Sequence, residues 1–145
     1  MSPPRVLLDS SVPQYALGAQ SRWRTSCRDV LSAITIGRLD ALASAEMVRE
    51  VVHHRLRMTN DPGRAVADAR DVALLASIVA FDEAVLLTAL ELIAESGIRG
   101  RDAVHAATAL TRGVRAIIST DPAFDAVPHL ERVEPADVED WAARQ

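Results

Sequence analysis

Two aspartates follow apolar stretches that are typical of buried strands. Residues 5–8 (RVLL) lead directly into Asp9, and residues 116–119 (AIIS) are followed two positions later by Asp121. Ligands of an open parallel sheet bind beyond the carboxyl ends of its strands, so both side chains are expected at the same edge. Two carboxylates brought together there repel each other unless a positive group lies between them. This pattern favours a ligand site over simple helix capping by Asp9.

Two further acids lie in predicted helices that can reach the same edge. Glu50 follows a predicted helix start at Ser44, and Asp102 opens the segment RDAVHAATAL, whose alanines form a small apolar face. Taken alone, each acid has an ordinary explanation. Glu50 is then a solvated carboxylate, and Asp102 is an acid that the dipole of its helix stabilises. The four acids indicate a shared site only in combination.

The rest of the sequence predicts strands that alternate with helices. Apolar spacing, glycines and capping residues place strands at 5–8, 39–43, 78–81, 116–119 and near 133, and helices near 13, at 22–36, 44–58, 64–76, 83–95, 101–112 and 135–141. Such alternation is typical of a mainly parallel sheet covered on both faces. We therefore expect one α/β domain over residues 1–145, built as three α/β/α layers.

Composition excludes several classes of protein. The 145 residues are 49% hydrophobic, which suits one compact domain. The single cysteine, Cys27, cannot form an intrachain disulfide and fits a reducing compartment. No apolar run has the length of a signal peptide or a membrane span, so a soluble cytoplasmic protein is expected. The net charge of −4 neither supports nor excludes an RNA substrate, because a metal ion would neutralise clustered acids.

Four segments of the chain resemble the PIN-domain ribonucleases, and among them the VapC-type toxins of bacterial toxin–antitoxin pairs. The order and spacing of these segments carry the resemblance, which spans essentially the whole chain. They are LLDSSV at 7–12, SAEMVREVV at 44–52, GRDAVHAATAL at 100–110 and IISTDPAF at 117–124.

The resemblance implies a PIN-like fold and assigns roles to specific residues. It implies that four acids form the catalytic and metal-binding set, and these are Asp9, Glu50, Asp102 and Asp121. It also implies that two serines line the same pocket, Ser11 and Ser119. Glu46 is the weaker candidate for the second acid, because the family's acid lies six residues after the position of Ser44. The chain departs from the family at Ala123, where many relatives carry another acid.

The chemistry implied is hydrolysis of a phosphodiester. Carboxylate oxygens suit hard cations, so Mg²⁺ is the expected cofactor, with Mn²⁺ as an alternative. Such an ion activates water and offsets charge on the phosphate. The resemblance therefore implies an Mg²⁺-dependent endoribonuclease toxin that cleaves single-stranded regions of structured RNA (tRNA, rRNA or mRNA). It also implies a homodimer and a cognate antitoxin whose tail, often basic, enters the acidic pocket.

RNA needs positive side chains around such a pocket. The foremost candidates are Arg22, Arg24, Arg99 and Arg101. The few aromatic residues argue against base stacking as the main source of affinity; Trp23 could serve as a stacking surface, but packing in the core is favoured for it. His105 is expected to pack its helix, although it lies three residues after Asp102 and can reach the pocket. Residues 44–76 are the first candidate for an exposed apolar surface that binds the antitoxin.

Two alternative functions have to be weighed at this point. A PIN-like domain that has lost catalysis and serves as a scaffold would have the same sequence pattern, and metal-dependent RNA cleavage that disappears in Asp9→Asn would exclude it. Receiver and phosphatase domains also place acids at the end of a parallel sheet, but they carry a lysine beside the phosphate. This chain contains no lysine, and it lacks the glycine patterns of nucleotide-binding loops.

Overall fold

The central sheet of the computed structural model, which describes residues 2–145, has five strands. They are β1 (Arg5–Leu8), β2 (Asp40–Ser44), β3 (Ser77–Val79), β4 (Ala116–Ile118) and β5 (Glu131–Val133). Their order is β3-β2-β1-β4-β5, and every neighbouring pair is parallel. The predicted α/β class is confirmed, and the described sheet is parallel throughout.

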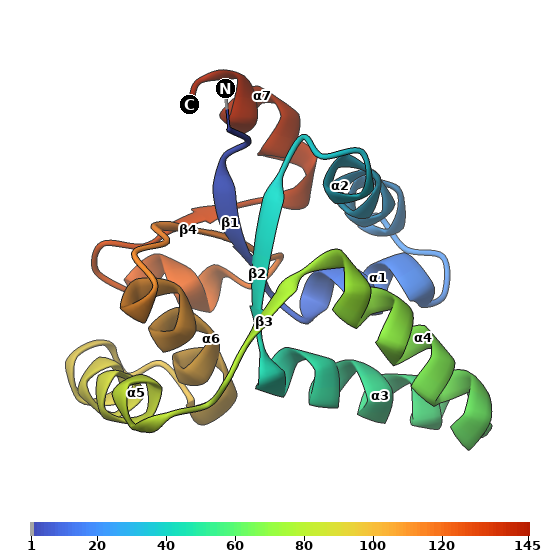
Figure 1. Ribbon diagram of the computed structural model, residues 1–145, viewed down its shortest axis with the longest axis horizontal. Coiled ribbons are helices and arrows are strands. Elements are labelled where there is room, and N and C mark those ends of the chain that lie inside the picture. The colour runs from blue at the N-terminus through green and yellow to red at the C-terminus, as the bar shows by residue number, and fades with distance from the viewer. Residues whose placement is uncertain (1) are drawn as a thin grey trace.

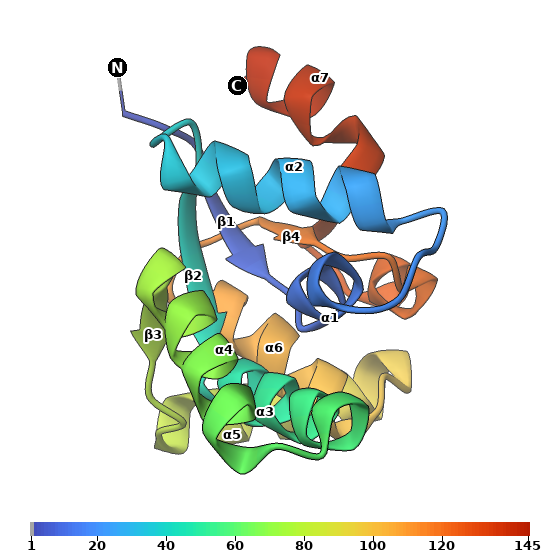
Figure 2. The ribbon, with the colours of Figure 1, turned by 90° about the vertical axis from the view of Figure 1, so that its right-hand side faces the viewer.

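The helices connect these strands and cover both faces of the sheet. They are α1 (Ser11–Leu17), α2 (Arg24–Thr35), α3 (Ala45–Thr59), α4 (Pro62–Leu75), α5 (Glu83–Ser96), α6 (Gly100–Thr111) and α7 (Val138–Ala143), with short 3-10 helices η1 (Pro122–Ala126) and η2 (Pro135–Asp137). Figure 1 shows α5 and α6 on one side of the strands and α1 to α4 on the other. Figure 2 shows α2 and α6 on opposite sides of the sheet.

The predicted capping residues explain where α3 and α5 begin. Ser44 Oγ accepts the Met47 N–H at 3.1 Å, and Asp82 Oδ1 accepts the Val85 N–H at 3.0 Å. Helix α5 ends at Gly97, whose φ of +69° is the left-handed conformation that glycine adopts without strain. The 3-10 turn η1 was not predicted. It forms because Asp121 Oδ1 accepts the Ala123 N–H at 2.9 Å.

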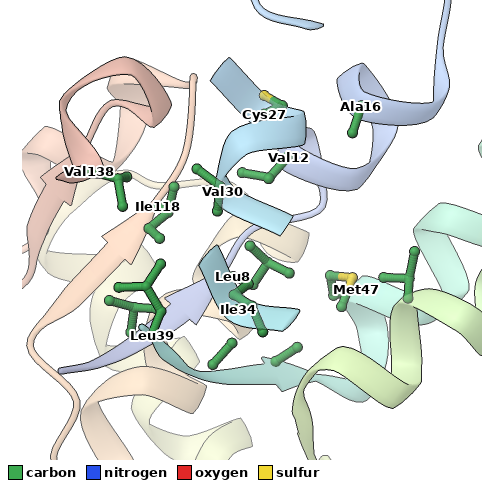
Figure 3. Close-up of a cluster of buried hydrophobic side chains, with 14 of the residues drawn as sticks. Leu8, Val12, Ala16, Cys27, Val30, Ile34, Leu39, Met47, Ile118 and Val138 are labelled. Atoms are coloured by element: carbon green, nitrogen blue, oxygen red, sulfur yellow. The ribbon is translucent and has the colours of Figure 1, made fainter. Parts of the chain in front are cut away.

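Alternate residues of the strands pack into two separate cores. Leu8 and Ile118 face the core that includes α1 and α2, where they contact residues such as Val12, Val30 and Met47 (Figure 3). Leu7, on the opposite face of β1, belongs to the second core, under α5 and α6. The central strand β1 is therefore held from both sides, and its last residue has a fixed position.

Helix α6 packs its alanines against the sheet. Ala103, Ala106 and Ala107 are fully buried in the same core as Leu7 and Ile117. Methyl side chains allow the helix backbone to approach the strands closely. Its first turn, which contains Asp102, thereby reaches the carboxyl ends of β1 and β4. These two strands flank the point where the strand order reverses, which is where open parallel sheets bind ligands.

The exposed apolar side chains extend beyond the predicted region. Within residues 44–76 they are Leu56, Met58, Val66 and Leu74. The segment from β3 through α5 adds Ile78, Phe81, Leu86, Leu87, Leu90 and Ile93. Residues 44–76 thus do expose apolar side chains, but α5 exposes further ones, and the antitoxin surface stays a prediction. In residues 2–145, no helix combines the length and the apolar character that crossing a membrane requires.

The close approach of α6 gives a first testable prediction. Ala106→Leu inserts three carbon atoms into a fully buried position and should lower the free energy of unfolding by about 1–3 kcal/mol. Ala94→Leu, at an exposed position on α5, is the matched control and should change it by less than about 0.5 kcal/mol. Urea denaturation measures both. Equal stabilities of the two variants would contradict the packing described here.

Candidate metal centre and active site

Asp9 is a buried carboxylate that is held in one orientation. Its side chain is 5% exposed, and its backbone N–H extends the pairing of β1 with β4 by donating to Ile118 O at 3.2 Å. Oδ2 accepts the Ser119 hydroxyl at 2.7 Å and, more weakly, the Ser11 N–H at 3.3 Å. Asp9 therefore does make a capping contact with α1, but only through one oxygen. Oδ1 lies 3.9 Å from His105 Nε2.

Asp102 and His105 bring further ligand atoms to Asp9. One ligand atom from each of these three residues lies within 4.8 Å of the other two. Burial, and then the negative charges of Asp9 and Asp121, raise the pKa of Asp102 to about 6. The carboxylates therefore repel each other in the protein without a cation. The two carboxylates at this spacing offer hard oxygen donors that can hold a divalent metal ion, and the imidazole of His105 lies beside them.

Glu50 is held by hydrogen bonds on both of its oxygens. Ser10 Oγ donates to Oε2 at 2.6 Å, and His105 Nε2 donates to Oε1 at 2.8 Å. His105 is completely buried, and its other ring nitrogen, Nδ1, lies 2.7 Å from Ser44 Oγ. Because a carboxylate can only accept, Nε2 carries the hydrogen in its bond with Glu50. His105 thus fixes the orientation of Glu50, in addition to packing α6 as predicted.

The charges of this pair reinforce each other. Burial alone would raise the pKa of Glu50, but the hydrogen bond and charge of His105, with smaller contributions from Ser10 and Arg101, lower it below its usual value. Burial alone would lower the pKa of His105. The bond to Glu50 and the charges of Asp9, Glu50 and Asp102 outweigh burial and raise it. Glu50 is consequently ionised at neutral pH.

Asp121 lies at the edge of the cluster, and Glu46 lies outside it. The Asp121 N–H donates to Ser119 Oγ at 3.0 Å, which connects its backbone to the serine that holds Asp9. Its carboxylate caps η1 and contributes to the raised pKa of Asp102. Glu46 instead pairs with Arg49 on the exposed side of α3. The choice of Glu50 over Glu46 agrees with this geometry.

All four predicted acids line a single cavity of about 620 Å³. This volume falls in the range of about 300–1,000 Å³ that is typical of ligand sites. Ser11 also lines the cavity, whereas Ser119 lies behind its wall and acts through Asp9. The structure therefore brings together acids from β1, α3, α6 and the turn after β4.

The predicted arginines divide into two groups. Arg22, Arg99 and Arg101 line the same cavity, and within residues 2–145 none of them forms an ion pair with a carboxylate. Arg24 was predicted with them, but it does not line the cavity. Its Nη1 donates to Gln20 Oε1 at 2.8 Å, in the loop before α2, which holds its guanidinium against the preceding loop.

Three residues at the site were missed or assigned differently from the sequence. Ser10 was not singled out, and nothing in the sequence distinguishes it from Ser11. Trp23 was expected in the core. It does pack against that core, but it is only partly buried and also lines the cavity. His105 was favoured as a packing residue, although its spacing from Asp102 was a signal for the pocket.

Comparison with known proteins identifies relatives over most of the chain. Residues 6–130 match the family model described as "PIN domain". The chain is 34% identical to Ribonuclease VapC7 of Mycobacterium tuberculosis over 129 residues, which are 82% of this chain and 83% of that protein. It is 21% identical to Ribonuclease VapC13 of the same organism, over 88% of this chain and 98% of that protein.

Solved structures have the same fold. DNA-bound VapBC from Salmonella typhimurium matches with a TM-score of 0.71 at 14% identity, over 91% of this chain and 98% of that chain. Mycobacterium tuberculosis VapC20, described as a sarcin-ricin loop cleaving toxin, matches with a TM-score of 0.67 at 15% identity, over 83% of this chain and 93% of that one.

The raised pKa of Asp102 predicts how the metal-free protein responds to pH. A folded-state pKa of about 6, against a usual value of 3.8, means that the folded protein binds more protons than the unfolded chain between these pH values. The Asp102 carboxyl therefore lowers the free energy of unfolding as pH rises from about 4 to 6, and this loss of stability is complete above that range. The pKa shift corresponds to a destabilisation of about 3 kcal/mol, or about 1–2 kcal/mol after solvent screening.

Asp102→Asn should remove this repulsion. In a chelating buffer at pH 8 the variant should be more stable than wild type by about 1–2 kcal/mol in urea denaturation, and the gain should vanish near pH 4. Asp71→Asn, an exposed carboxylate on α4, is the control and should show no such pH-dependent gain. A stability gain of equal size at both pH values would contradict the repulsion.

Proposed function

The chain belongs to the PIN-domain family, in its VapC branch, and from that premise we propose that it is a divalent-metal-dependent endoribonuclease. The observation that carries the proposal is the meeting of Asp9 and Asp102, with Glu50 and Asp121, in one cavity. Family membership alone leaves room for a scaffold that has lost its catalytic residues. Here all four acids are retained and share a site, which favours an active enzyme.

The donor set fits a hard divalent cation. Carboxylate oxygens dominate the cluster, and a cation would relieve both causes of the raised pKa of Asp102, which are burial and the charges of Asp9 and Asp121. We propose Mg²⁺, with Mn²⁺ as an alternative, held by Asp9 and Asp102 directly and by Glu50 directly or through water. Asp121 completes the pocket. When bound, the ion activates water and neutralises charge on the phosphate.

The protein's own groups position the reactants. Glu50 is ionised and has both oxygens fixed by hydrogen bonds, so it can orient water or accept its proton. Ser119 keeps Asp9 in one rotamer through its 2.7 Å hydrogen bond. The unpaired guanidinium groups of Arg22, Arg99 and Arg101 attract the phosphate backbone. Together these groups place a phosphodiester against the acids.

Single-stranded segments of structured RNA are the proposed substrate. A single-stranded segment can present both its backbone and its bases to a concave site, whereas the bases of a regular duplex are stacked and paired. The relatives named above as ribonucleases, and the loop-cleaving toxin with the same fold, support this class. Such RNA places the activity in the cytoplasm.

A cognate antitoxin is the proposed protein partner. Solved neighbours include a toxin–antitoxin complex from Klebsiella pneumoniae and DNA-bound VapBC from Salmonella typhimurium. A basic antitoxin tail would be attracted to the four acids and would compete with the metal and RNA. The exposed apolar residues on α3, α4 and α5 offer surfaces for this partner and for a second copy of the chain.

Substitution of single acids tests the nuclease. Asp9→Asn and Glu50→Gln should each reduce Mg²⁺- or Mn²⁺-dependent cleavage of single-stranded RNA by more than about 100-fold, beyond the loss typical of outer-shell changes. Glu46→Gln, one helical turn from Glu50 and outside the cavity, is the matched control and should retain activity. The measurement is the initial rate on a labelled RNA. Wild type that is as inert as Asp9→Asn with both ions would instead support a scaffold.

The bond between His105 and Glu50 gives a second prediction. His105→Ala removes the donor to Oε1 and should lower kcat by about 10–100-fold with little change in KM, because RNA contacts remain. His105→Gln retains an N–H donor and should recover part of the loss. Urea denaturation of both variants separates catalysis from stability. Equal activity of the Ala and Gln variants, at equal stability, would show that the bond is unimportant.

A further inference from the structure

Two of the protein's few aromatic side chains lie together at the acidic cavity. The chain has two tryptophans, one tyrosine and two phenylalanines. Tyr15 of α1 and Trp23, just before α2, have ring centroids 4.7 Å apart with the rings tilted by 37°. Both line the cavity that contains Asp9 and Asp102. The buried Phe124 and Trp141 serve the cores, so the pair at the cavity is a distinct arrangement.

A positive side chain covers the tryptophan. The guanidinium carbon of Arg22 lies 4.2 Å from the centre of the Trp23 ring. Arg22 is exposed, and within residues 2–145 no carboxylate pairs with it. A cation–π contact at an exposed site is weak, and the guanidinium can leave the ring at little cost. The ring is therefore available to another flat group.

We propose that Trp23, supported by Tyr15, is a stacking site for one unpaired nucleobase beside the acidic cluster. Arg22 moves from the ring to a neighbouring phosphate when the base binds. The inference rests on the proposed nuclease function and adds to it a site that recognises the substrate. A π face together with unpaired guanidinium groups matches the two parts of a nucleotide, its base and its phosphate.

The site would select unpaired bases over paired ones. Every base has a π face, so stacking on Trp23 is tolerant of sequence, but a base within a duplex is already stacked on its neighbours. Cleavage in single-stranded regions then follows from the position of Trp23 at the same cavity as the acids. An aromatic surface in a protein partner is the competing occupant, and the experiment below distinguishes it.

The test uses Trp23 as its own reporter. Trp141→Phe leaves Trp23 as the single tryptophan, and Asp9→Asn in the same chain prevents cleavage. Titration with a fluorescein-labelled six-nucleotide RNA in Mg²⁺ should quench the Trp23 emission in step with the rise in fluorescein anisotropy. Competition with unlabelled RNA excludes energy transfer to the dye as the cause of quenching.

Substitutions at Trp23 then measure the stack. In the Asp9→Asn chain, Trp23→Leu should raise the Kd for RNA about tenfold, the loss expected when one base loses its aromatic partner. Trp23→Phe should recover most of the affinity. Phe81→Leu, an exposed aromatic outside the cavity, is the matched control and should leave the Kd unchanged. Arg22→Gln should reduce the slope of log K against log salt by about 0.7, the value for one phosphate contact.

An RNA with a single abasic site makes the test specific. The abasic RNA should bind wild-type Trp23 more weakly than intact RNA at one of its positions, whereas Trp23→Leu should not distinguish the two. If Trp23→Leu leaves the Kd unchanged in the Asp9→Asn chain, and leaves the cleavage rate unchanged in the chain that retains Asp9, the stacking site is overturned and the nuclease stands. If the wild-type protein neither binds nor cleaves the RNA, both proposals are overturned. If Trp23 emission responds only to a protein partner and not to RNA, Tyr15 and Trp23 belong to the interface with that partner, and the stacking site is overturned.

Discussion

Repulsion between carboxylates at the carboxyl end of β1 is the constraint on which the site depends. Asp9 is buried and Asp102 lies close enough to share an ion with it; burial, and then the charges of Asp9 and Asp121, raise the pKa of Asp102 to about 6. A fold that holds such groups together without a cation loses stability. A function that needs negative oxygens at one point explains why these groups lie together, and the hydrolysis of a phosphodiester proposed above is such a function.

The fold meets this constraint by fixing each acid from a different direction. Asp9 is fixed by a central strand that is packed on both faces, and Asp102 by a helix whose alanines lie directly on the sheet. Glu50 arrives on α3 and is held by His105 from α6, so two helices are tied together by one hydrogen bond. The same helix thus supplies one acid and orients another. A shift of α6 would disturb both at once.

The sequence predicted the parts of this site that depend on strand ends and on spacing. Asp9 and Asp121 could be placed because apolar strands precede them, and Glu50 could be chosen over Glu46 because the PIN-domain pattern places its acid six residues after the position of Ser44. The contacts of His105, Ser10 and Trp23 could not be predicted in the same way. Each depends on how two elements approach each other in space, as α3 and α6 do at Glu50 and the consecutive helices α1 and α2 do at Trp23. The position of Arg24 could not be predicted for a different, local reason. Its guanidinium donates a hydrogen bond to Gln20, and Arg24 does not line the cavity that Arg22 lines.

The positive side chains at the cavity are all arginines, in a chain without lysine. A guanidinium stays protonated throughout the biological pH range, and lysine acetylation cannot neutralise it. The positive charge on the cavity rim is therefore insensitive to acidity and to that modification. Its attraction for a polyanion still weakens as ionic strength rises, because mobile ions screen the guanidinium charge whatever the pH.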